Sequence, residues 1–267
     1  MTRHTIALTR DGAIATLTID RPEKRNALTN EMLEEIERLA RQYQFFHWHL
    51  AFPDVFRAAV NDQPADNPAA GWNGGFDAVL GNPPWEQIQF DPQEYFAITM
   101  PEIANAQHMS ARNKMIEALQ ESDSQVYSQY EVELRRSHGT QSFVHNSGLY
   151  PLTSYGRLNT APLFSELSRR LVIPSGRIGI VVPSGIAFDS FNQFFFQDII
   201  KKQSLIRFFD FENREGLFKD VDSRYKLSLL TMTSEYSPWL QGGEFVFFAQ
   251  SVQDTNNLER RFNLTAP

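Results

Sequence analysis

The sequence contains no cysteine among its 267 residues. Disulfides, thiolate nucleophiles and cysteine-ligated zinc or iron–sulfur centres are therefore excluded. Long apolar runs are also missing, because no stretch reaches the roughly 20 residues that a membrane helix needs. Charged residues at Arg10, Asp11 and Asp20 break the apolar core that a secretory signal would require. We expect a chain that acts in the cytoplasm and does not enter a membrane.

Net positive charge is lacking as well. The formal net charge is −7 and the isoelectric point is about 5.4. Affinity for DNA comes largely from phosphate neutralisation by lysine and arginine, so this balance counts against tight DNA binding by this chain alone. The length allows one large or two small domains, and 42% hydrophobic residues with 22 Phe predict a globular chain with an aromatic core.

The most informative stretch begins with an apolar run at residues 76–80, which is typical of a buried strand. The run is followed, after one glycine, by Asn82-Pro83-Pro84-Trp85. Ligands bind at the carboxyl ends of strands in open α/β sheets. The prolines confine Asn82 and Pro83 to extended conformations, while the Pro83 carbonyl stays a free acceptor. The loop thus offers a side-chain oxygen, a fixed backbone oxygen and a flat aromatic ring.

These three groups suit the activation of a planar amino group such as adenine N6. That nitrogen is a poor nucleophile because its lone pair is delocalised into the ring. Acceptors from Asn82 and the Pro83 carbonyl would bind its two N–H groups, favour tetrahedral geometry and free the lone pair. Trp85 would stack on a base that has been flipped out of the duplex.

The motif Asn82-Pro83-Pro84-Trp85 resembles the Asn/Asp-Pro-Pro-aromatic motif of S-adenosylmethionine-dependent DNA methyltransferases that modify exocyclic amino groups. Residues 74–85 are similar to the Eco57I-like, adenine-specific (N6) enzymes of restriction-modification systems, and the resemblance extends over residues 45–250. It implies catalytic roles for all four motif residues and substrate contacts for Asn82, Pro83 and Trp85. It also implies S-adenosylmethionine as cofactor, DNA as partner, and a partial Rossmann-like methyltransferase fold of class α/β that holds the catalytic half of the sheet.

The first 36 residues resemble a different family. Residues 5–10 and 13–19 alternate like two strands joined by a turn at Asp11-Gly12, and residues 21–28 form a loop. Thr29 or Asn30 then caps a helix that runs through Ile36. This opening resembles that of enoyl-CoA hydratases (the crotonase superfamily). We interpret residues 1–36 as a graft of hairpin and helix without hydratase chemistry.

The remaining chain is interpreted as the methyltransferase catalytic half at residues 37–250, with a helical insertion at about 91–150 and the start of a truncated region at 251–267. His47 and His49 would lie on one face of a strand, which suggests a metal, but only two ligands are visible and structural roles are favoured. We therefore predict no metal site.

The second half of the sheet is predicted from residue 157 onward. Thr160 is expected to cap a helix that reaches about Val172 and ends at residues 174–176. The apolar strand at 177–182 is typical of a parallel sheet. The elements expected after it are a turn at residues 183–185, a Phe-rich helix at about 192–202, and strands at 205–211 and 225–232, which would form the reversed hairpin that ends such folds.

The cofactor half of the resembled fold is missing. It normally opens with a strand and a Phe-x-Gly-x-Gly loop, and the sequence contains no such loop before Asp77. Because positioning of the reactants contributes about 7–11 kcal/mol to such reactions, we predict that the isolated chain is inactive or nearly so. Two alternatives stay open. The first is a non-catalytic or split-enzyme partner that binds nucleic acid, and the second is an enoyl-CoA hydratase-like fragment. A complementary methyltransferase fragment or a specificity domain is a further expected partner.

Overall fold

The structure, a computed structural model, describes residues 6–11, 14–19, 28–44, 46–58, 64–68, 70–216, 219, 222–235 and 242–265. Gly12 of the predicted turn and most of the predicted loop at 21–28 lie outside these residues. Within the described part, no helix is long and apolar enough to cross a membrane.

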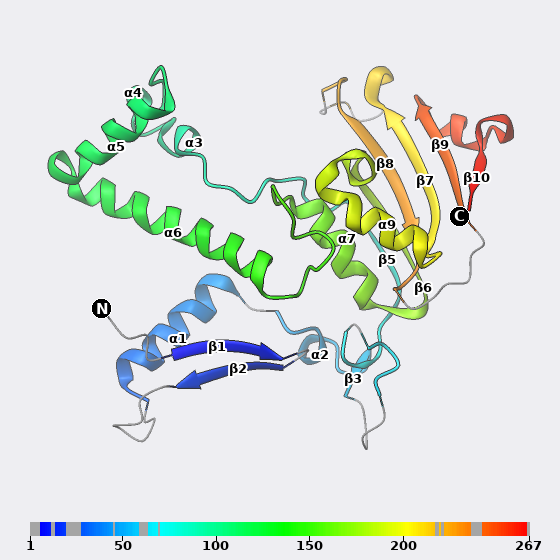
Figure 1. The fold of residues 1–267 in the computed structure, drawn as a ribbon, viewed down its shortest axis with the longest axis horizontal. Coiled ribbons are helices and arrows are strands. Elements are labelled where there is room, and N and C mark those ends of the chain that lie inside the picture. Colours follow the sequence, from blue (N-terminus) through cyan, green and yellow to red (C-terminus); the bar gives the residue numbers. More distant parts are fainter. Residues whose placement is uncertain are drawn as a thin grey trace.

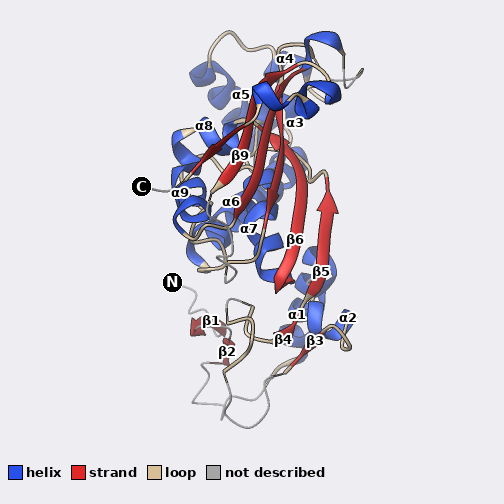
Figure 2. Cartoon of the chain, turned by 90° about the vertical axis from the view of Figure 1, so that its right-hand side faces the viewer, coloured by secondary structure: helices blue, strands red, loops and turns tan. Residues whose placement is uncertain are grey.

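A six-stranded mixed sheet forms the centre of the α/β fold, with the order β10-β9-β7-β8-β6-β5 (Figures 1 and 2). β5 pairs in parallel with β6, β8 runs antiparallel to both β6 and β7, and β9 is parallel to β7 but antiparallel to β10. The bounds of the strands are β5 (Phe76–Gly81), β6 (Val172–Pro183), β7 (Leu205–Glu212), β8 (Lys226–Met232), β9 (Gly243–Ala249) and β10 (Phe262–Leu264).

The predicted strands at 76–80, 177–182, 205–211 and 225–232 are confirmed. β8 inserts antiparallel between β6 and β7, which is the arrangement of a hairpin folded back into the sheet. β6 begins earlier than predicted, because Pro174 and Gly176 lie within the strand, at a register shift opposite β5. A shift of this kind lets a strand accommodate residues that would otherwise end it. β9 and β10 extend this sheet, although the sequence pattern did not predict either strand.

One face of the sheet is covered by α7 (Thr160–Leu171), α8 (Gly185–Phe188) and α9 (Gln193–Lys201). Side chains in β6 alternate between the two faces, so Ile178, Ile180 and Val182 all lie on the covered face and are at most 5% exposed. They pack against Phe195 of α9 in the largest buried cluster. This face is the main hydrophobic core.

β5 is the last strand of the sheet, and the prediction that it is buried is wrong. Leu80 is 82% exposed, and of the strand's side chains only Val79 packs against the main core. The physical reason is its position at the edge, where β6 is its only partner among the described strands and where α7 lies against one of its faces. An apolar sequence predicts a strand but cannot show how many neighbours that strand will have.

The part of the chain that connects β5 to α7 forms a helical arm, which lies apart from the sheet (Figure 1). It comprises α3 (Pro92–Phe96), α4 (Pro101–Ala104), α5 (Met109–Ser122) and α6 (Ser124–Asn146), all of which lie within the segment interpreted as a helical insertion. Phe96, Ile103, Ile116 and Leu119 form a small core of their own.

The N-terminal strands β1 (Ile6–Asp11) and β2 (Ile14–Ile19) pair antiparallel, as predicted. α1 (Asn30–Tyr43) is capped by Thr29, whose hydroxyl accepts from the Met32 N–H at 3.2 Å. The helix continues past Ile36 without interruption. Next come α2 (Trp48–Ala51), β3 (Phe56–Arg57) and β4 (Asn73–Gly74).

His47 and His49 do not lie on a strand, because the chain forms α2 at this point. The centroids of their two rings are 5.8 Å apart, and the His49 ring stacks on the Trp72 ring with a centroid distance of 4.7 Å. The described residues contain no group of three or more side chains suited to holding a metal ion.

Candidate functional site

The Asn82–Trp85 motif leaves β5 at its carboxyl end, as the sequence predicts. Asn82 is exposed and Pro83 is half-buried. In the part of the chain that the structure describes, neither the Asn82 side chain nor the Pro83 carbonyl has a hydrogen-bond partner. Both acceptors of the predicted pair are therefore open to a ligand.

Trp85 differs from the exposed stacking surface that the sequence suggested. Its indole N–H donates to the Val181 carbonyl of β6 at 3.3 Å, and its ring is half-buried against the clusters on both faces of the sheet. Trp85 thus ties the loop to the end of β6, and only the exposed part of its ring is available to a ligand.

The three backbone carbonyls that follow Pro83 all accept hydrogen bonds from Asn159 or Thr160. Thr160 Oγ1 donates to the Pro84 carbonyl at 2.6 Å and accepts from the Glu86 N–H at 3.0 Å. The Thr160 N–H donates to the Glu86 carbonyl at 2.9 Å. Asn159 Nδ2 donates to the Trp85 carbonyl at 3.4 Å. We call Asn159 and Thr160 the loop clamp, because together they bind the three carbonyls after the predicted acceptor.

Asn159, and not Thr160, caps α7. Its Oδ1 accepts from the Ala161 N–H at 2.9 Å, which leaves the Thr160 side chain free to bind the motif loop. At the other end of this helix, Asn67 Nδ2 donates to the carbonyls of Arg170 at 2.7 Å and Val172 at 3.2 Å. Both ends of α7 are therefore fixed by asparagine side chains.

Two charged residues of α7 are fully buried. Arg169 donates to Asp198 of α9 at 2.8 Å and to Ser204 at 3.3 Å. Glu166 accepts from the Thr153 hydroxyl at 2.6 Å and pairs with Arg170 at 3.2 Å. Burial raises the pKa of Glu166, although these donors partly oppose the increase. The Nε atom of Arg169 has no hydrogen-bond partner among the described residues, but the paired charges of Arg169 and Glu166 join α7 to α9 and to the segment before it.

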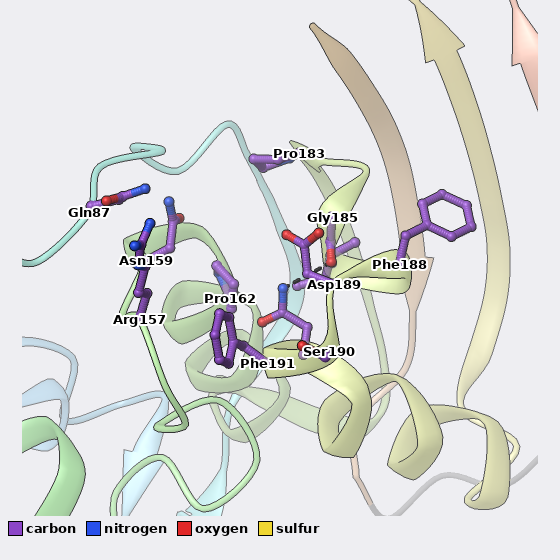
Figure 3. Close-up of a pocket in the computed structure, with 12 residues that line it drawn as sticks. Gln87, Arg157, Asn159, Pro162, Pro183, Gly185, Phe188, Asp189, Ser190 and Phe191 are labelled. Carbon is purple, nitrogen blue, oxygen red and sulfur yellow. Dashed lines mark hydrogen bonds between the residues drawn. The ribbon is translucent and has the colours of Figure 1, made fainter.

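A pocket of about 590 Å³ lies beside the motif loop, between the segment that contains Gln87 and the turn after β6. Gln87, Asn159 and Arg157 lie on one side, whereas Gly185 and Asp189 lie on the other (Figure 3). The four motif residues do not line it, but Gln87 is two residues from Trp85 along the chain. The side chains at hand are one cation, one anion, several amides and the Phe188 and Phe191 rings. Such a lining suits a polar, planar ligand.

A buried polar cluster supports the turn that bounds this pocket. Ser184, which precedes Gly185, donates its hydroxyl to Asp210 of β7. Ser228 of β8 donates to Ser184 Oγ at 2.9 Å, and the Phe248 N–H donates to Asp210 Oδ2 at 3.4 Å. This cluster was not predicted from the sequence. A single aspartate within the apolar run at 205–211 was the signal that could have revealed it, since a buried carboxylate needs donors.

Comparison with known families adds one finding. Residues 4–117 match the family model described as the Eco57I restriction-modification methylase. This supports a methyltransferase family and a role in restriction-modification. The matched part contains the motif loop and β5 and ends within α5, so the resemblance of later residues stays a prediction from sequence. A search of curated proteins found no match.

The match begins at residue 4, so it spans the segment that resembles enoyl-CoA hydratases. The interpretation of residues 1–36 as a graft stays a prediction, and so does the division at Ile36, which lies in the middle of α1.

Methylases use S-adenosylmethionine, so we tested whether the described residues fit this cofactor. The Phe-x-Gly-x-Gly loop of the resembled enzymes is absent from the sequence, and the sheet has no described strand beyond β5, where the cofactor half of such a fold would continue. The described residues therefore do not fit a complete cofactor site.

Proposed function

We propose that this chain is the catalytic region of a site-specific, adenine-N6 DNA methyltransferase of a restriction-modification or phage-defence system. The observation that carries the proposal is that some hydrogen-bond acceptors of the motif loop are bound by other residues and others are not. The Asn82 amide and the Pro83 carbonyl are open, whereas the carbonyls of Pro84, Trp85 and Glu86 are bound. A pair of open acceptors at the carboxyl end of a strand matches the two N–H groups of an exocyclic amine.

The residues would act by positioning and polarisation. Asn82 Oδ1 and the Pro83 carbonyl accept the two N–H groups of the amine and hold its nitrogen close to tetrahedral geometry, which makes the lone pair available. The loop need not rearrange on binding, because two prolines, the loop clamp and the Trp85 N–H already fix it. S-adenosylmethionine supplies the methyl group in enzymes of this kind.

The adjacent pocket is proposed to take the flipped base. Its volume of about 590 Å³ is within the usual range for sites that bind small molecules. Its rings can contact a base face and its amides can read base edges. DNA as substrate is supported by the family match, and the net charge of −7 requires that phosphate contacts be local or shared with a further protein segment.

The proposal is tested by N6-methyladenine formation, measured by mass spectrometry of digested DNA. The chain is assayed together with a separately expressed cofactor-binding half of an Eco57I-like enzyme. Asn82→Ala should lower the rate at least about 100-fold, by analogy with the loss of one polar contact to the reacting group. Asn113→Ala, at an exposed position of α5, is the matched control and should leave the rate unchanged. Full activity of the Asn82→Ala protein would refute the proposed grip on the amine.

The split-enzyme alternative is favoured by one specific observation, the unpaired outer edge of β5 among the described residues. Under that alternative, the isolated chain gives no heat with S-adenosylmethionine in calorimetry and gains methylation activity only when the complementary half is added. Tight binding of S-adenosylmethionine by the chain alone would overturn the prediction that the cofactor half is missing. The hydratase alternative has no supporting contact in the described residues and would be revived by turnover of an enoyl-CoA thioester.

A further inference from the structure

The loop clamp has geometry that neither helix capping nor general loop rigidity requires. Asn159 alone caps α7, so Thr160 could hold any side chain that tolerates the first helical turn. Instead, its hydroxyl both donates to the Pro84 carbonyl and accepts from the Glu86 N–H. The single hydroxyl thereby binds the residue before Trp85 and the residue after it.

From this geometry we propose that Thr160, assisted by Asn159, is a positioning residue that selects the Pro83 carbonyl as the acceptor for the substrate amine. The proposal rests on the proposed function, because it assigns the origin of the free acceptor beside Asn82. Each loop carbonyl after Pro83 is turned toward α7 and engaged there. The Pro83 carbonyl is the one left between Asn82 and the bound carbonyls.

The bonds of Thr160 provide selection as well as rigidity. Prolines fix φ at positions 83 and 84, and Pro84 also restricts ψ of Pro83 to extended values, but no following proline restricts ψ of Pro84. The direction of the Pro83 carbonyl relative to the pocket therefore depends on how the segment after it is held. The 2.6 Å bond from Thr160 Oγ1 fixes the Pro84 carbonyl, and the 2.9 Å bond from the Thr160 N–H fixes that of Glu86. With both ends of the segment fixed, the Pro83 peptide can take few orientations.

The clamp also links the amine-binding groups to the adjacent pocket. Asn159 lines that pocket and donates to the Trp85 carbonyl at 3.4 Å. Trp85 in turn donates to Val181, two residues before Pro183 on the opposite wall. A change in the clamp should therefore alter both the orientation of the acceptor and the environment of the Trp85 indole.

The test uses the whole chain, 2′-deoxyadenosine monophosphate as probe, and two readouts. The first is the ¹⁵N–¹H signal of the Trp85 indole, assigned with Trp85→Phe, in a protein with only four Trp residues. The second is the dissociation constant of the nucleotide. Thr160→Val, which removes the hydroxyl and keeps the shape, should shift the Trp85 signal and weaken nucleotide binding about fivefold. Thr160→Ser, which keeps the hydroxyl, should give the same Trp85 signal and the same dissociation constant as the unaltered chain.

Three further variants separate a positioning role from a structural one. Asn159→Asp keeps the cap acceptor but loses the donor to Trp85, so it should have a smaller effect of the same kind. Thr140→Val is the matched control, because that hydroxyl bonds only to Arg136 of its own helix at 3.0 Å. The indole signals of Trp48 and Trp72 should stay in place in every variant, which confirms that the fold is intact. Asn82→Ala should weaken nucleotide binding without moving the Trp85 signal.

The outcomes distinguish the two proposals. If Thr160→Val leaves the Trp85 signal and nucleotide binding unchanged while Asn82→Ala weakens binding, the positioning role is wrong and the proposed function stands. If Asn82→Ala leaves binding unchanged, or the unaltered chain binds no nucleotide, the proposed function fails in its amine-binding step. In that case a shifted Trp85 signal in Thr160→Val would still establish that the clamp orients the loop, and an unshifted one would overturn it.

Discussion

β5 and β6 are neighbouring parallel strands of one sheet, but they are held in place by different forces. Ile178 and Val182 of β6 are fully buried, and β6 has a hydrogen-bonded strand on each side. Within the described part of the chain, β5 has one such neighbour, and its Leu80 is 82% exposed. The loop that carries the proposed chemistry nevertheless follows β5. Its position depends on a few hydrogen bonds from α7 and β6, whereas β6 is positioned by burial.

This difference shows how the motif loop can be both exposed and fixed. A buried strand end would restrict access to Asn82, and an unsupported edge strand would leave the loop to move. Here the main core lies against the neighbouring strand β6. α7 packs in that core and holds the loop in place through hydrogen bonds from Asn159 and Thr160. Binding groups on a rigid scaffold but outside its core are a general solution to this conflict.

The largest effect on stability is expected where α7 and α9 join on the covered face. Asp198→Ala leaves the fully buried Arg169 without its charge partner and should lower the free energy of unfolding by about 3–5 kcal/mol. Urea denaturation followed by circular dichroism measures the change. Glu37→Ala, which removes the exposed pair with Arg41, is the control and should cost about 0.5 kcal/mol or less. Equal effects would show that the covered face does not anchor α7.

The next prediction compares the two strands directly. Ile178→Ala in β6 should lower the free energy of unfolding by about 2–5 kcal/mol, since it creates a cavity in the main core. Leu80→Ala in β5 should change it by no more than about 0.5 kcal/mol. The same denaturation experiment checks both variants. A large cost for Leu80→Ala would mean that its side chain is covered in solution, which would contradict the exposed edge.

A smaller effect is expected for the contact that joins the two strand ends. Trp85→Phe keeps most of the ring but removes the N–H that donates to the Val181 carbonyl. The net loss of one such hydrogen bond should cost about 0.5–1.5 kcal/mol. Amide hydrogen exchange should rise in the motif loop but not in the centre of β6. Uniform protection in both places would contradict the view that hydrogen bonds fix the loop.

The smallest effect is a change in the slope of stability against pH. Because burial raises the pKa of Glu166, the folded state keeps a proton that the unfolded chain releases above the ordinary value of 4.5. The free energy of unfolding should therefore fall as the pH rises from 4.5 to the raised pKa and stay lower above it. Glu166→Gln should flatten this decline in urea titrations between pH 4 and 8. Glu133→Gln, at a half-exposed position of α6, should leave the decline intact.

Much of the fold could be predicted from local patterns. Alternating or continuous apolar residues identified β5, β7, β8 and α9, and the capping residue Thr29 identified the start of α1. Errors arose where two local signals compete. Asn159 and Thr160 are both good caps, and only the position of the motif loop engages the Thr160 hydroxyl elsewhere. Pro174 and Gly176 are strand breakers, but a register shift opposite β5 accommodates them within β6.

The candidate site could be predicted only in part. The Asn82–Trp85 motif was visible because its chemistry lies in adjacent residues. Asp210, Ser184 and Ser228 were not, since they come from three segments that are separate along the chain: the turn after β6, β7 and β8. The pocket has the same property, because it joins Gln87 to Asp189.

The sequence by itself determined the residue types that can meet an amine, the order of the main strands and helices, and the lack of a Phe-x-Gly-x-Gly loop. These follow from short-range stereochemistry and composition, which do not depend on distant neighbours. The tertiary structure decided that β5 lies at an edge, that Trp85 is partly buried, and that α7 holds the motif loop. Those facts depend on contacts between segments that are about 75 residues apart in the sequence. Local propensity does not determine such contacts.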